Sequence, residues 1–127
     1  GSCIAVCIYD PVRKMGGMNH YMLPLWNGEG LASVKFGNIA IEKLVSQMEE
    51  LGSDRKNLYA KIFGGANQVN YTMKIGERNV HVARTLLNEM KINIVAESVN
   101  GQKGRKIIFN SYTGEVRMKY VNSNLTK

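Results

Sequence analysis

Residues 3–9 read Cys-Ile-Ala-Val-Cys-Ile-Tyr, a run that is almost wholly apolar and rich in residues that favour β-strands. A short apolar run of this kind is typical of a strand buried inside a sheet. Asp10 and Pro11 follow, and they suit the first two positions of a type I turn. We therefore predict a central strand over 3–9 that turns back after Asp10 into a second strand over 18–23, which Pro24 ends.

Two amphipathic helices are expected further along the chain. Apolar residues recur at helical spacing over 38–51, where Asn38 is a candidate N-cap and Gly52 a C-terminal stop. A second helix is expected from about Glu77 to Met90. The residues expected to face the core are Ile41, Leu44, Val45, Met48 and Leu51 in the first helix, and Val80, Ala83, Leu87 and Met90 in the second.

Four more strands are expected, over 58–63, 93–99, 106–110 and 115–121, with a hairpin turn at 112–114 between the last two. The element order ββαβαβββ predicts an α/β (α+β) fold, a layered sandwich of two helices on a mixed, mostly antiparallel sheet. The 127 residues fit a single domain over 1–127, because the sequence shows neither a repeat nor a linker.

The composition is that of a folded domain, with 44% hydrophobic and 21% charged residues. Apolar runs are far shorter than the ~20 residues of a membrane-spanning helix, so no membrane insertion is expected. No export signal is recognised, so the expected location is cytoplasmic. The net charge is +7, and most of it comes from the segment after Gly101, which favours an acidic partner. Its basic residues are Lys103, Arg105, Lys106, Arg117, Lys119 and Lys127.

Cys3 and His20 are the one pair of residues in the sequence that could act together as a nucleophile and a base. If Asp10 pairs with Arg13 around the turn, Cys3 lies directly opposite His20, and directly opposed side chains have Cβ atoms about 4.5–5.5 Å apart. An imidazole beside a thiol raises its thiolate fraction, as nucleophilic acyl chemistry requires. From spacing alone, a structural cysteine and histidine remain an alternative.

The remaining cysteine and histidine are expected to be structural. Cys7 lies about 13 Å from Cys3 along a strand, too far for one zinc ion to bind both, so we expect Cys7 in the core and no metal site. His81 follows Glu77 by one helical turn and is expected on the surface.

Two stretches of the sequence are distinctive, Gly-Ser-Cys-Ile-Ala-Val-Cys-Ile-Tyr-Asp-Pro at 1–11 and Gly-Gly-Met-Asn-His-Tyr-Met-Leu-Pro at 16–24. They give the chain a resemblance to the bacterial chemoreceptor glutamine deamidase family, CheD. Weaker glycine motifs continue it in order at 61–66, 75–80 and 104–107. The family implies a layered α/β fold like that of deamidating toxins, and a cysteine hydrolase that converts receptor glutamines to glutamates without a cofactor.

In this resemblance Cys3 corresponds to the nucleophile and His20 to its histidine. Backbone N–H groups near Ser2 and Cys3 would stabilise the oxyanion, and Ser2 and Asn19 are the candidate substrate contacts. The implied partners are the cytoplasmic helices of chemoreceptors and a CheC-type phosphatase. The family's N-terminal strand and its assisting threonine have no counterpart before Gly1, so the expected domain lacks them.

Three other functions remain open at this point. The first is a non-catalytic chemotaxis module that regulates a CheC-type phosphatase. The second is a basic nucleic-acid-binding domain. This function is disfavoured because the sequence lacks stacking aromatics, a basic recognition helix and zinc-finger spacing. The third is transfer of the acyl group to an amine, which shares the same thioester. Hydrolysis of a glutamyl methyl ester would be a related side activity. We further expect the basic residues between Lys103 and Lys119 to help dock an acidic receptor surface.

Overall fold

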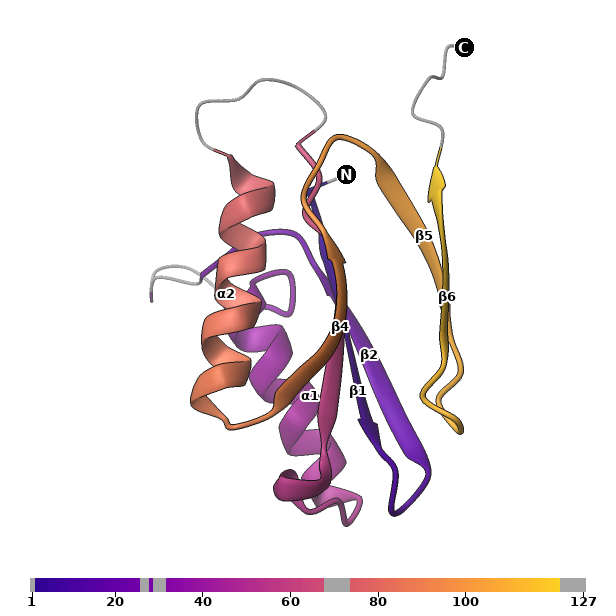
Figure 1. The fold of residues 1–127 in the computed structure, drawn as a ribbon. Helices are drawn as coiled ribbons and strands as arrows, with labels where there is room; N and C mark the ends of the chain where they lie inside the picture. Colours follow the sequence, from indigo (N-terminus) through magenta and orange to yellow (C-terminus); the bar gives the residue numbers. More distant parts are fainter. Residues whose placement is uncertain (1, 26–27, 29–31, 68–73, 122–127) are drawn as a thin grey trace.

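The computed structural model describes residues 2–25, 28, 32–67 and 74–121. Figure 1 shows two helices, α1 and α2, on one side of a four-stranded sheet and a two-stranded hairpin on the other. The elements are β1 (Ile4–Asp10), β2 (Met15–Tyr21), α1 (Gly37–Glu50), the 3-10 turn η1 (Arg55–Asn57), β3 (Tyr59–Gly64), α2 (Ile75–Glu89), β4 (Asn93–Val99), β5 (Gly104–Phe109) and β6 (Val116–Val121). The predicted α+β fold and its element order are therefore confirmed.

The four-stranded sheet has the order β2-β1-β3-β4 and is mixed, as predicted. β1 runs antiparallel to both of its neighbours, whereas β3 and β4 run parallel and are joined through α2. β5 and β6 pair only with each other, so they form a third layer instead of extending the sheet. No helix in the described part of the chain is long and apolar enough to cross a membrane.

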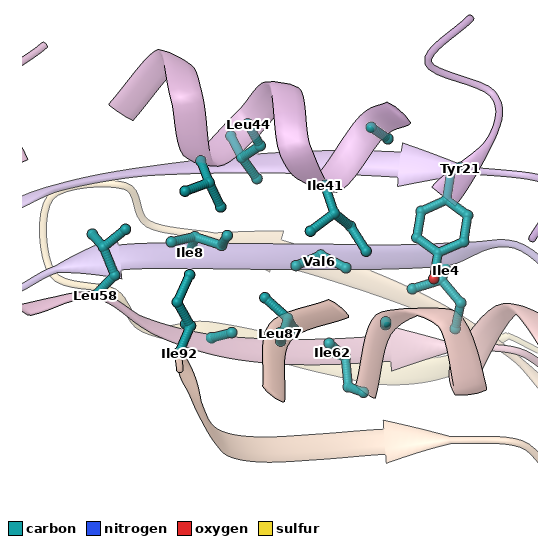
Figure 2. Packing of buried hydrophobic residues seen from close by; sticks show 14 of the residues in the cluster. Ile4, Val6, Ile8, Tyr21, Ile41, Leu44, Leu58, Ile62, Leu87 and Ile92 are labelled. Carbon is teal, nitrogen blue, oxygen red and sulfur yellow. The ribbon is translucent and has the colours of Figure 1, made fainter. Parts of the chain in front are cut away.

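The core lies between the sheet and the helices, and β1 is its centre. β1 is buried along its whole length, which explains why its sequence is apolar on both faces. Ile4, Val6 and Ile8 point toward the helices, where they pack among Ile41 of α1 and Leu87 of α2 (Figure 2). The alternate side chains of β1, from Ala5 to Tyr9, face the hairpin layer.

The turn end of the hairpin is fastened to the sheet. The Lys61 ammonium donates a hydrogen bond to the carbonyl of Gly114 at 2.9 Å, and the Tyr9 hydroxyl donates to the carbonyl of Tyr112. Gly114 has a φ of 80°, and a Cβ there would lie 2.8 Å from the Tyr9 ring, so only glycine fits this contact. The open end of the hairpin lies beside the start of β1.

The predicted start of α1 was wrong by one residue, and the predicted N-cap was wrong as well. α1 begins at Gly37, and its N-cap is Phe36, which makes no side-chain capping bond. Contacts with the exit of β2 position this end, because the Gly37 N–H donates to the Leu23 carbonyl at 2.8 Å and a Cβ at Gly37 would lie 2.7 Å from the Tyr21 ring. Gly52 ends the helix as predicted, with a φ of 108°.

The predicted register of the first hairpin was also wrong. β2 spans Met15–Tyr21, Asp10 pairs with Met15, and Ala5 lies opposite His20 where Cys3 had been expected. The pairing is therefore shifted by two residues from the prediction.

The loop between β1 and β2 explains the shift. Asp10 accepts hydrogen bonds from the N–H groups of Val12 at 2.9 Å and Arg13 at 3.1 Å, so the first part of the loop turns around its carboxylate. Lys14 then adopts a left-handed conformation with a φ of 54°, which lengthens the loop to residues 11–14. A shift by two residues keeps every side chain on its original face of the sheet.

Candidate functional site

A cleft of about 380 Å³ opens between the four-stranded sheet and the open end of the β5–β6 hairpin. Its walls come from the start of β1, from β2, from the end of β3 and from the hairpin. The lining residues are Cys3, Ala5, Met18, His20, Phe63, Gly64, Gly104, Arg105, Ile107 and Val121. The two residues that the sequence singled out, Cys3 and His20, are both among them.

Cys3 and His20 are diagonal neighbours on one face of the sheet. Ala5 lies opposite His20, and Cys3 precedes Ala5 by two residues, so all three side chains point to the cleft. Diagonal neighbours in antiparallel strands are about 7–8 Å apart, within reach of a long or aromatic side chain such as imidazole. Cys3 is half-buried and His20 is exposed, so the thiol lies in the wall and the imidazole at the mouth.

Two glycines at the end of β3 fix the backbone of Cys3. The Gly65 N–H donates to the Cys3 carbonyl at 2.9 Å. Gly64 has a φ of 115°, and a Cβ there would lie only 2.2 Å from the same carbonyl oxygen. Among the hydrogen bonds between described residues, none uses the N–H of Cys3.

The two predicted substrate contacts lie next to the catalytic candidates but differ in orientation. Ser2 immediately precedes Cys3, and its carbonyl accepts a hydrogen bond from the Asn79 amide at 2.9 Å. Asn19 lies between two cleft residues of β2, so its side chain points to the helix side, where it accepts from the Val6 N–H at 3.3 Å. A role of Ser2 or Asn19 in substrate binding stays a prediction.

Cys7 is a core residue, as predicted. It is only 2% exposed, and burial raises the pKa of its thiol to about 12, although the Lys61 charge opposes this shift. A thiol with that pKa stays protonated near neutral pH and is a poor nucleophile. His81 is exposed on α2, as predicted, and its nearest polar partner is the Thr85 hydroxyl at 3.5 Å.

Arg105 has a different position from that expected of a docking cation. Its Nε donates to the Ser98 hydroxyl at 2.9 Å, and its other nitrogens donate to the carbonyls of Asn100 at 3.0 Å and Gly64 at 3.3 Å. The guanidinium also lies 5.3 Å from the centre of the Tyr120 ring. Arg105 thus ties the open end of the hairpin to the ends of β3 and β4 and so sets the width of the cleft.

Sequence reasoning missed this bracing role of Arg105, because the partners come from three separate segments. Its positive charge gave the only signal, and that signal equally fits a surface residue. The described residues contain no group of three or more His, Cys, Asp or Glu side chains that could hold a metal ion. The cleft does offer the thiol of Cys3, directly before β1, and the imidazole of His20 on β2, the pair needed for covalent acyl chemistry.

A family model and several known proteins are similar to this chain. The family described as CheD chemotactic sensory transduction matches residues 22–120. A Sulfurimonas denitrificans protein named "Probable chemoreceptor glutamine deamidase CheD" is 50% identical over 125 residues, which cover 95% of this chain and 80% of that protein. Proteins of the same name from Trichlorobacter lovleyi and Archaeoglobus fulgidus are 51% and 38% identical, over 91% and 94% of this chain and 74% and 79% of their own lengths.

Proposed function

The chain belongs to the CheD family, and from this premise we propose that it is a cysteine hydrolase that deamidates glutamine side chains of chemoreceptors. The reaction consumes the side-chain amide and one water and yields a glutamate and ammonia. The observation that carries the proposal is that one cleft brings together Cys3 and His20 from neighbouring strands. A glutamine side chain is long and thin enough to enter such a cleft from a helical surface.

In the first half of the reaction, the Cys3 sulfur attacks the carboxamide carbon. His20 takes the thiol proton, and a carbon–sulfur bond forms while the carbonyl oxygen becomes an oxyanion. The tetrahedral intermediate then collapses: the carbon–nitrogen bond breaks, His20 returns the proton to nitrogen, and ammonia leaves. The product of this half-reaction is a glutamyl thioester on Cys3.

In the second half, water enters the space left by ammonia. His20 removes a proton from this water, which attacks the thioester carbon, and the thiolate of Cys3 leaves and regains its proton. The half-exposed position of the site provides a path for this water. An amine in place of water would give acyl transfer, and a glutamyl methyl ester in place of the amide would give methanol.

The oxyanion needs donors that are already in place before the reaction. The N–H of Cys3 has no partner among the described residues and lies on the attacking residue itself. Loss of one such donor typically costs about 2.7–4 kcal/mol of transition-state stabilisation. Ser2 and Asn19 are proposed to contact the substrate next to this position.

Two partners follow from the proposed activity. The substrate is a helix of the chemoreceptor cytoplasmic region, which presents the glutamine to the cleft. A CheC-type phosphatase is proposed to offer a receptor-like helix to the same cleft and thereby inhibit the enzyme. Competition between the two for one site is the expected behaviour.

The direct test is ammonia release from a purified receptor cytoplasmic fragment. Wild type should release ammonia and convert glutamine to glutamate, as mass spectrometry would show, whereas Cys3→Ala and His20→Ala should lower kcat by at least about a hundredfold. Cys7→Ala is the matched control, because it removes the other thiol from outside the cleft, and it should remain active. If the full chain binds the phosphatase but releases no ammonia, it is a non-catalytic module and the proposed hydrolase is wrong.

A further inference from the structure

Asn79 of α2 joins the two chain segments that carry the proposed catalytic pair. It is completely buried, and its Nδ2 donates hydrogen bonds to the carbonyls of Ser2 at 2.9 Å and Met22 at 3.0 Å. Its own backbone carbonyl accepts a hydrogen bond from the Tyr21 hydroxyl, which is buried beside it. One residue of α2 therefore holds both the start of β1 and the exit of β2.

The two hydrogen bonds of the Asn79 amide, called the clamp from here on, lie where the hydrogen-bond ladder between β1 and β2 ends. The last ladder pair between β1 and β2 at this end is Ile4 with Tyr21. Cys3 and Met22 would form the next pair, but they lie outside both strands. The two N–H groups of the Asn79 amide bridge the segments here, where the regular ladder bonds have ended.

The clamp also fixes the peptide group that precedes the nucleophile. In a trans peptide the C=O and the following N–H point in opposite directions, so a Ser2 carbonyl held toward Asn79 turns the Cys3 N–H away from Asn79. The Cys3 carbonyl is held independently by the N–H of Gly65. Both peptide groups of Cys3 are therefore fixed, while its N–H stays without a described partner.

We infer that Asn79 is a positioning residue for the hydrolysis: it sets the Cys3 sulfur and N–H relative to His20 without touching the substrate. This inference rests on the proposed function. Asn79 belongs to α2 in the helix layer and is absent from the cleft lining on the other face of the sheet, so it acts only through the backbone. Its Oδ1 is buried and has no partner among the described residues, so the donated bonds are what distinguish this amide from an apolar side chain of equal size.

Asn79→Leu tests the inference, because leucine keeps the volume and removes both donors. Leu87→Ala is the control, since it creates a cavity in the same helix and lowers stability while it leaves both hydrogen bonds of the Asn79 amide in place. Relative to this control, Asn79→Leu should lower kcat roughly tenfold to a hundredfold and change KM little. It should also change the pH profile of Cys3 alkylation by iodoacetamide, since the relation of the thiol to His20 changes.

A kcat and an alkylation profile equal to those of Leu87→Ala would overturn the inference, because Asn79 would then only stabilise the fold. If Asn79→Leu does not fold, Asn79→Ala can be compared with Leu87→Ala in the same way. Alkylation needs no turnover, so it also separates the two proposals. If wild type releases no ammonia but Asn79→Leu still alters Cys3 alkylation, the proposed reaction fails and the positioning role stands.

Discussion

The two cysteines differ in how far the fold buries their thiols. Cys3 and Cys7 are four residues apart, so both side chains point to the same face of the sheet. Cys3 directly precedes β1 and lies in the cleft wall, whereas Cys7 lies in the middle of β1 between β2 and β3. Burial raises the pKa of the Cys7 thiol to about 12, so the thiolate that reacts with electrophiles is scarce there.

Brief treatment of the native protein with iodoacetamide between about pH 7 and pH 9 should therefore modify Cys3 and leave Cys7 free. The pH stays below the pKa of about 12, so Cys7 remains a protonated thiol throughout this range. Unfolding in urea should remove the difference, because both side chains then meet the same solvent. Peptide mass spectrometry measures both rates, and equal labelling in the native state would contradict the assignment of Cys7 to the core.

At the scale of the element, the β1–β2 hairpin decides whether the site forms. Its register depends on Asp10, which is completely buried and accepts hydrogen bonds from Val12, Arg13 and the Ser53 hydroxyl, the last at 2.7 Å. Burial alone would raise the pKa of Asp10, but these hydrogen bonds together outweigh it and hold the pKa below its usual value. The ionised carboxylate is thus the form that the folded hairpin favours.

Asp10→Ala should lower the free energy of unfolding by about 1–3 kcal/mol at pH 7, because it removes the acceptor of the buried Ser53 hydroxyl and of two N–H groups in the loop. Because the pKa of Asp10 is lower in the folded protein than in the unfolded chain, its ionisation stabilises the fold at every pH above the unfolded pKa of about 3.9. This stabilisation is lost as the pH falls through the pKa that Asp10 has in the folded protein. The difference in the free energy of unfolding between wild type and Asp10→Ala should therefore become smaller at acidic pH. Urea unfolding at each pH would measure it. Asp54→Ala is the control, because Asp54 is exposed. If the stability difference between wild type and Asp10→Ala did not change with pH, this account would be contradicted.

The hairpin also shows which features could be predicted from the sequence. The apolar run of β1 predicted a buried strand correctly, and a two-residue error in pairing still placed Cys3 and His20 on one face, because the side-chain period of a strand is two. The register itself could not be predicted, since it depends on the left-handed conformation of Lys14 in the loop. Periodicity likewise could not reveal that Asn79 reaches the distant Ser2 carbonyl, because such contacts exist only after the helix packs.

At the scale of the whole molecule, the positive charge of the hairpin divides between two faces. Arg105 points inward and braces the cleft, while Lys106, Arg117 and Lys119 line a shallow outer face. Lys106 lies opposite Lys119, and no ion pair between described residues includes any of the three. The exposed Ile108 lies among them. Unpaired charges near the cleft favour encounter with an acidic partner surface.

The double reversal Lys106→Glu with Lys119→Glu should therefore lower kcat/KM on a receptor fragment and flatten its dependence on salt, with little change in kcat. The control is Lys56→Glu with Lys91→Glu, which changes the net charge equally but lies at the opposite end of the sheet, near the starts of β3 and β4. Steady-state rates at several salt concentrations measure the effect. If kcat/KM depended on salt concentration equally in the two double variants, this face would have no role in docking.

The division of the strands into two separate sheets has a consequence for synthesis. A ribosome delivers Cys3, His20 and all four strands of the main sheet before it delivers the hairpin that completes the cleft. A nascent chain that has just passed Val99 can thus pair every strand of that sheet while Cys3 still lacks the wall formed by Gly104, Arg105 and Ile107. The last two described strands thus complete the cleft, so the proposed catalytic site forms only after they have been made.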